Sequence, residues 1–343
     1  MDDRYEAFHN PLASCHLQAR CVVEAESRYH PDADQVALAT TMHQSLAALL
    51  PVARLHACHV EDAGTWSSLE QIGIFGIGVS EQRGGSGLGS AEEALIVIGL
   101  GRCLAAPAVL ATIGATHARD AAGAIDLQGR KVAAAYRRGA RIIVVDDPSA
   151  DLVLVRDQGA AALHEIKDTH AASIDDRLWL AHLRSAENLG RPLACFDAPQ
   201  LLRLKLIDAA ALAGIAEATL DMAVAYAGIR EQFGRPIGTF QALKHHCANM
   251  AIAARCARDQ VSFAAIAIDE DRDDAPLQVE SAVFVAGSAA LENAGKNIQI
   301  HGGMGFSDEA DPHLFLKRAQ LQLAIAGGLE AANSRLANMS LGA

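Results

Sequence analysis

Apolar residues follow a helical period over the first third of this 343-residue chain. From Asp34 they recur every three or four positions until Pro51 ends the run. Three shorter helical segments are predicted at Trp66–Ile72, Ser90–Cys103 and Pro107–Ala121. The pattern therefore predicts an all-helical region over residues 34–122, whereas residues 1–30 show too little periodicity to predict an element.

The middle of the chain changes character. Short, partly β-branched apolar runs are separated by turn-forming Asp, Pro, Ser and Gly residues, which is typical of strands. They lie at Arg141–Val145, Leu152–Val155 and Ala160–Ile166, with a further extended stretch near Leu178–Leu183. Residues 124–195 are therefore predicted to form a small β domain.

Helical periodicity returns after Pro199 and persists to the end of the chain. One apolar helix face is made by Leu204, Ile207, Ala211, Ile215, Ala218, Met222 and Ala225. Further long helices are predicted at Phe240–Asp269, Leu277–His301 and Pro312–Met339. Short connections between them indicate an antiparallel four-helix bundle. The predicted fold is mainly α, with domains at 1–123, 124–198 and 199–343.

Composition narrows the function classes. A net charge of −12 argues against nucleic-acid binding as the main role. Seven cysteines, an odd number without a CxxC pair, favour a reduced, cytoplasmic compartment, and fourteen histidines form no metal-ligand motif. The polar start MDDRYEAFHN is unlike a signal peptide, and we expect no apolar run long and uncharged enough to span a bilayer.

Two segments carry candidate chemistry. In Tyr226–Gln241, YAGIREQFGRPIGTFQ, a helix is expected to run out at Arg230 and to restart near Phe240. In Gln299–Phe306, QIHGGMGF, the paired glycines Gly302 and Gly303 would let backbone N–H groups face an anion. A permanently charged Arg, a Gln amide and exposed N–H groups suit a diphosphate.

Both segments resemble the acyl-CoA dehydrogenase family, in which they hold the ADP half of FAD across a subunit boundary. The order of helices, small β domain and bundle agrees with this resemblance. It implies FAD as cofactor, an acyl-CoA substrate and an electron-transfer flavoprotein as electron acceptor. The ADP contacts it implies are Arg230, Gln232, Phe233, Phe240, Gln241, Gln299, Gly302 and Gly303. Without the resemblance, these residues would be interpreted as a helix-end Arg, a core Phe and a glycine C-cap.

The loop Ser80–Gly89, SEQRGGSGLG, is rich in glycine but is not a dinucleotide-binding fingerprint. It is neither GxGxxG between a strand and a helix nor a Walker motif. It resembles the family's first-domain loop PExxGGxGxG, which implies that it shapes the acyl-CoA side of the cleft.

The family's catalytic glutamate has no counterpart here. The resemblance places it at Gly327, counting onward from Arg318, or at Leu204, counting back from Arg230. Neither residue can take a proton. Asp208, one helical turn after Leu204, is a candidate displaced base, although it also fits a polar bundle residue or salt-bridge partner.

Two further features complete the comparison with the family. Glu330 lies about one turn past Gly327, where a solvated helix carboxylate is the simpler interpretation. Residues 124–195 contain no phrase like the family's TEPxxGSD, which contacts the flavin ring, so this β domain looks reduced.

The phrase GFSDEADPHLFLKRA is similar to that of short subunits in heteromeric (α2β2) bacterial acyl-CoA dehydrogenases, which act on CoA thioesters of steroid side chains. The resemblance implies an ADP-gripping subunit whose longer partner supplies the glutamate and the ring-binding β domain. One alternative is a self-sufficient homo-oligomer with a displaced base. A flavin-free assembly protein is the other.

Overall fold

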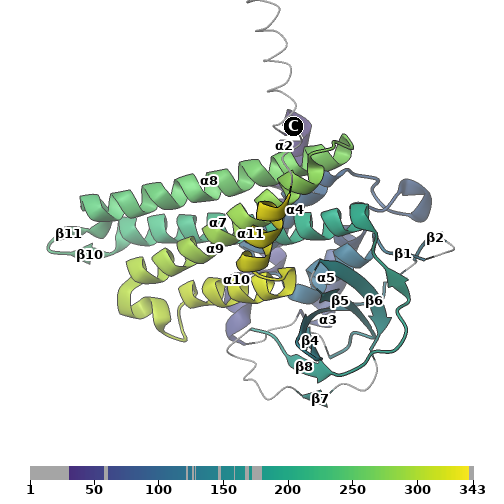
Figure 1. The fold of residues 1–343 in the computed structure, drawn as a ribbon. Coiled ribbons are helices and arrows are strands. Elements are labelled where there is room, and N and C mark those ends of the chain that lie inside the picture. The colour runs from purple at the N-terminus through teal and green to yellow at the C-terminus, as the bar shows by residue number, and fades with distance from the viewer. Residues whose placement is uncertain are drawn as a thin grey trace, which may run out of the picture.

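The computed structural model describes residues 31–57, 61–120, 123–125, 127, 129–145, 148–157, 159–166, 170–171 and 180–339. Residues 1–30, on which the sequence predicts nothing, lie outside this set. Figure 1 shows the chain as a layer of long helices with a twisted sheet below one end of it. The prediction of a mainly helical fold with a small sheet and a C-terminal helical bundle is confirmed.

The first helical region begins where the sequence supplies caps. Asp32 and Gln35 form a reciprocal capping box, and Asp62 accepts from two backbone N–H groups at the start of the next helix. The helices are α2 (Ala33–Leu49), α3 (Ala63–Gln71), α4 (Ser90–Arg102) and α5 (Pro107–Ala115), with 3-10 turns η1 (Val52–His56), η2 (Ile74–Gly76) and η3 (Glu81–Arg83). α5 is shorter than predicted, because the chain turns into a strand at Arg119.

The expectation about membrane-spanning length is wrong. Residues Ala33–His56 are long and apolar enough to cross a membrane by length and composition alone, the one such stretch among the described residues. The segment lies near the N-terminus and is mostly unburied, and a single helix of this kind is weak evidence. Pro51 interrupts the stretch just after the end of α2, so its apolar pattern looks shorter in the sequence than the whole segment is.

A mixed sheet follows the first helical region. Its order is β7-β8-β4-β3-β5-β6-β9, in which β3 and β5 are parallel and the other neighbours antiparallel. The strands are β3 (Val132–Arg138), β4 (Arg141–Val145), β5 (Leu152–Asp157), β6 (Ala160–Glu165), β7 (His170–Ala171), β8 (Leu183–Ala186) and β9 (Ala194–Cys195); β1 (Arg119–Asp120) and β2 (Gly123–Ala124) form a separate pair.

Strand prediction fails at two places in this sheet. The central strand β3 has no β-branched residue after Val132 and contains three alanines, so propensity gave no signal; its burial by neighbouring strands decides its conformation. β8 begins at Leu183 rather than near Leu178, and residues 172–179 lie outside the described set.

The C-terminal helices form the bundle. They are α7 (Ala198–Ile229), α8 (Gln241–Asp269), α9 (Ala275–His301), α10 (Pro312–Ala326) and α11 (Leu329–Asn338), with the hairpin β10 (Glu231–Gln232) and β11 (Arg235–Pro236) and the turns η4 (Ile237–Thr239) and η5 (Gly302–Phe306). The single helix predicted for Pro312–Met339 is wrong. Gly327 and Gly328, at φ of 96° and 87°, end α10 and turn the chain into α11.

α7 crosses α4 at very short range, and glycine makes this possible on both sides. A Cβ on Gly101 would lie 2.0 Å from the Ala211 carbonyl oxygen, and one on Gly214 would lie 2.1 Å from that of Ile98. The first helical region and the bundle consequently share one continuous core. A second core lies where the sheet meets α5, α7 and α10.

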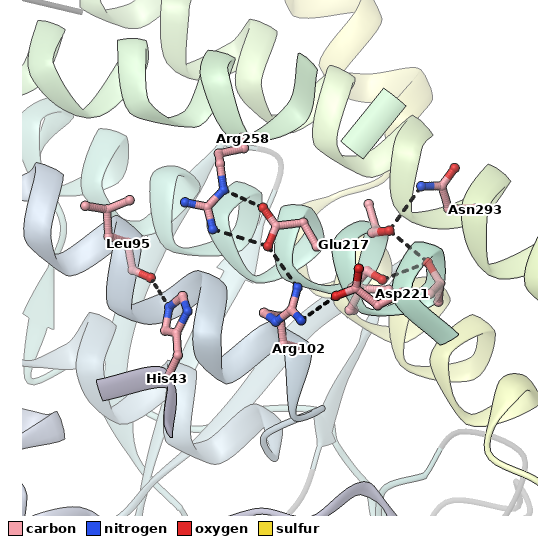
Figure 2. Close-up of polar contacts among 10 residues, drawn as sticks. His43, Leu95, Arg102, Glu217, Asp221, Arg258 and Asn293 are labelled. Carbon is pink, nitrogen blue, oxygen red and sulfur yellow. Dashed lines mark hydrogen bonds and ion pairs between the residues drawn. The ribbon is translucent and has the colours of Figure 1, made fainter. Parts of the chain in front are cut away.

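Polar contacts reinforce this crossing (Figure 2). Arg102 of α4 and Arg258 of α8 both donate to Glu217 of α7, and Arg102 also reaches Asp221 at 2.6 Å. Asn293 of α9 donates to the backbone carbonyls of α7 and α8. These bonds fix the rotation and register of four packed helices, which apolar packing alone specifies less strictly.

Candidate functional site

One end of the bundle is built by the turn between α7 and α8. α7 ends at Ile229, and the two strands that follow pair Glu231 with Pro236 and Gln232 with Arg235. Phe233 and Gly234 form the turn, and both have positive φ, 55° and 75°. Two such residues make a tight hairpin turn of the mirror-image kind, in which Gly is favoured and Phe is rare.

The second predicted segment lies against this turn. The Tyr226 ring of α7 stacks on the His301 ring at the end of α9, with centroids 4.0 Å apart. Ile237 and Ile300 share a buried apolar cluster. α9 ends as Gly302 adopts φ 61°, and its N–H bonds back to the Gln299 carbonyl. The fold thus brings together the two segments singled out from the sequence.

The predicted ADP-contacting side chains are open to solvent. Phe233 is 93% exposed, and Phe240, half-buried, meets its edge with ring centroids 6.2 Å apart. Arg230 has no side-chain partner among the described residues. The other exposed members of the predicted set are Gln232, Gln241, Gln299, Gly302 and Gly303. We call these residues, together with Arg230, Phe233 and Phe240, the bundle-end patch.

The bundle-end patch has groups whose chemistry suits an anion. A guanidinium, several amides and glycines without neighbours within 4 Å of their Cβ positions can approach a diphosphate closely. Large apolar side chains are exposed around it: Ile229, Met304 and Phe306. Phe233 is 93% exposed at positive φ and contacts only the edge of Phe240 among the aromatic rings that the structure describes, so the arrangement suits contact with another molecule.

Burial lowers the pKa of the His301 imidazole, and its Nδ1 lies 2.8 Å from the Asn297 carbonyl oxygen. The ring nitrogen facing a carbonyl must donate, so Nδ1 carries a proton in the neutral ring. Stacked on Tyr226, His301 orients the start of the glycine turn rather than offering an exposed charge.

The other end of α7 meets the sheet, and neither family base position there holds an acid. Leu204 is 1% exposed and packs on α5, where a Cβ on Gly114 would lie 2.5 Å from its Cδ2. Gly327 terminates α10 in the left-handed region. An L-glutamate at position 327 would be strained, so the local backbone is built for glycine.

Asp208 lies inside this junction and is 3% exposed. Arg156 Nη2 donates to its Oδ2 at 2.5 Å, and Gln322 Nε2 donates to its Oδ1 at 2.9 Å. Burial raises the pKa of the Asp208 carboxyl, and the nearby Arg156 charge opposes that rise. The cavity beside it measures only about 20 Å³. This geometry matches a buried ion pair better than an accessible base.

Glu330 lies exposed in the first turn of α11 and approaches no buried group. The glycine-rich loop forms η3, and its residues Arg83, Gly84 and Gly85 line a cavity of about 270 Å³ with Trp66 and Phe75. No group of three His, Cys, Asp or Glu side chains able to hold a metal occurs among the described residues.

Sequence reasoning missed a cluster of charged residues at the sheet–bundle junction. Arg137, Arg156, Lys205 and Arg335 line a cavity of about 570 Å³ beside Gly327. They come from β3, β5, α7 and α11, so no spacing in the sequence could have linked them.

Comparison with known proteins finds similarity to acyl-CoA dehydrogenases. The family model described as the acyl-CoA dehydrogenase C-terminal domain matches residues 199–340, and the corresponding N-terminal domain matches residues 32–130. Acyl-CoA dehydrogenase IpdE2 of Mycobacterium tuberculosis is 34% identical over 75% of this chain and 80% of its own length. Acyl-CoA dehydrogenase FadE34 of the same organism is 47% identical over 32% of this chain and 16% of its length.

Solved structures show the same fold. The Tcur3481-Tcur3483 steroid ACAD matches with a TM-score of 0.74 and 21% identity over 89% of this chain and 97% of that one. The ChsE4-ChsE5 complex from Mycobacterium tuberculosis matches with a TM-score of 0.71 and 22% identity over 91% and 99%. At these identities the likeness concerns the fold.

Proposed function

Because this chain belongs to the acyl-CoA dehydrogenase family, an oxidoreductase family, we propose that it is the ADP-gripping subunit of a heteromeric enzyme that dehydrogenates an acyl-CoA between its α- and β-carbons. The observation that carries this proposal is the contrast along α7. The bundle-end patch is complete and exposed, whereas both family base positions hold residues without an acid.

The residues of the bundle-end patch fit half of FAD. Arg230, which has no side-chain partner among the described residues, would donate two hydrogen bonds to the diphosphate. Gln232, Gln299 and the N–H groups at Gly302 and Gly303 would add neutral donors. Phe233 and Phe240 would pack on the cofactor. When bound, FAD supplies the acceptor for the hydride that leaves the β-carbon. This chain's residues bind and orient it.

Removal of the α-proton is assigned to the partner. We propose a longer family member that supplies the glutamate and the ring-binding β domain, in an assembly of two copies of each chain. Two structures with this fold, a steroid ACAD and the ChsE4-ChsE5 complex, support a heteromer and a steroid-derived CoA thioester as the substrate class. An electron-transfer flavoprotein would take the electrons onward.

The first experiment changes Arg230 to Ala in the complex co-expressed with a genomically adjacent longer homologue. A charge-assisted hydrogen bond contributes about 1.5–3 kcal/mol, so FAD affinity should fall by about tenfold or more. Flavin absorbance per complex and the dissociation constant are measured. Arg255→Ala is the matched control, because Arg255 is an exposed arginine on α8 paired with Asp259. Normal flavin affinity in Arg230→Ala would refute the proposed contact between Arg230 and the FAD diphosphate.

The second experiment asks whether the chain works alone. Without the partner it should form a homodimer or aggregate and should not dehydrogenate any acyl-CoA. With the partner, native mass spectrometry should give a heterotetramer with two flavins. Activity of the isolated chain, abolished by Asp208→Asn, would instead support a self-sufficient homo-oligomer. A colourless complex would support the flavin-free assembly protein, and four flavins would mean that this chain also holds a flavin ring.

A further inference from the structure

The cavity at the sheet–bundle junction has a mixed lining. Its apolar wall comes from the end of α10 and from α11, with Ala324, Ile325 and Ala331, and from Leu201 of α7. The opposite wall carries cations at the carboxyl ends of the parallel strands β3 and β5. About 570 Å³ is within the range of sites that hold a small organic molecule.

The cations of this cavity are only partly neutralised. Arg156 pairs with Asp208, and Arg137 pairs with Asp157 at 2.7 Å. The Glu280 carboxylate of α9 pairs with two cations, Lys205 and Arg335. Glu280 is 1% exposed, so this sharing takes place away from bulk water.

A surplus of positive charge follows from this sharing. Among the described residues of the cluster, four cations face three carboxylates, which leaves one formal positive charge. Coulomb interactions are strong where water is partly excluded, so an uncompensated charge there attracts an anion. One surplus charge matches a carboxylate better than a doubly charged phosphate.

We propose that this cavity, which lies beside the position where the family carries its base, binds an organic carboxylate with an apolar body. The carboxylate faces Arg335 and Arg137, the two most exposed cations of the cluster, and the apolar body lies on the small residues of α10 and α11. The space for this ligand exists because small residues line the cavity: Gly159, Ala160, Ala326 and Gly327. The proposal does not depend on flavin binding at the bundle-end patch, which lies at the other end of α7.

The test is a calorimetric titration of the full-length chain with octanoate. Octanoate should bind, and its neutral analogue octanamide should bind at least about tenfold more weakly, because the surplus charge has no counterpart in the amide. Arg335→Gln removes that charge and should weaken octanoate binding by about tenfold or more. Ala331→Phe fills the cavity without changing charge and should also weaken it.

Arg255→Gln is the matched control, since it removes an exposed arginine from α8 and should leave octanoate binding unchanged. Far-ultraviolet circular dichroism checks that each variant is folded. Three results would overturn the proposal: no octanoate binding, equal losses in Arg335→Gln and Arg255→Gln, or tighter binding of inorganic phosphate or pyrophosphate than of octanoate. None of these readouts requires flavin or dehydrogenase activity.

Discussion

Charged side chains are buried and paired at one end of α7 and exposed at the other. At its first turns, beside the sheet, Asp208 and Lys205 are enclosed and paired with Arg156 and Glu280. At its last turn, Arg230 is exposed and has no side-chain partner among the described residues. Charges that are paired internally stabilise or specify the fold, whereas an exposed, uncompensated cation in a defined turn is available to another molecule.

The apolar residues differ in the same way. Leu204 at the junction is completely packed, whereas Phe233 at the bundle-end patch is exposed and holds a left-handed backbone. One end of the helix is therefore part of the structural core, whereas the other end is exposed.

The largest effect is expected at the junction. Arg156→Leu leaves the Asp208 carboxylate buried without its cation and should lower the free energy of unfolding by about 3–5 kcal/mol in urea denaturation. The double variant Arg156→Leu/Asp208→Leu removes both charges and should recover much of the loss. A single variant as stable as the wild type would mean that this pair is not structural.

A smaller effect is expected at the break between α10 and α11. Gly327→Glu restores a carboxylate at the family base position but forces an L-residue to φ 96°, which should cost about 1–2 kcal/mol of unfolding free energy. We also expect no dehydrogenase activity in the isolated variant. Gly228→Ala, in regular helix with open space around it, should not destabilise the chain. Equal stabilities of the two variants would contradict the backbone argument.

The pH dependence of the unfolding free energy tests the bundle end of α7 through His301. Burial lowers the pKa of His301, so the unfolded chain takes up a proton at a higher pH than the folded chain does. Stability should therefore fall as pH drops through about 6.5, the usual value for histidine. His301→Gln should show a shallower fall below that pH. An unchanged slope would place the acid sensitivity elsewhere.

The smallest effect on stability is expected from Phe233→Ala. The side chain is almost entirely exposed, so the unfolding free energy should change by no more than about 0.5 kcal/mol. Flavin retention by the assembled complex should nevertheless fall, as measured by absorbance after gel filtration. Val36→Ala, an exposed apolar residue on α2, is the control and should change neither quantity. Loss of stability without loss of flavin would reverse our interpretation of Phe233.

The residues of the bundle-end patch could be singled out from the sequence because they lie close together along the chain. Arg230, Gln232 and Phe233 are neighbours in one turn, and Gln299 and Gly302 are three residues apart on another. What the sequence did not reveal is how these turns meet, which depends on the Tyr226–His301 stack. The roles of these residues toward FAD remain predictions.

The junction could not be predicted for the opposite reason. Arg156 and Asp208 are separated by 52 residues and lie on different elements, so only the packed fold pairs them. The strand β3 is specified by burial rather than by propensity. The break at Gly327 was missed, although two consecutive glycines rarely continue a helix and could have indicated it.

The length of α7 limits what one copy of the chain can do. Leu204 lies in α7 and Arg230 caps the end of this unbroken helix, so a rise of 1.5 Å per residue separates them by roughly 39 Å. A single dinucleotide cannot bridge that span, so a molecule bound at the bundle-end patch would not reach the sheet–bundle junction of the same copy. α7 is thus a rigid spacer that holds the sheet–bundle junction and the bundle-end patch of one copy apart.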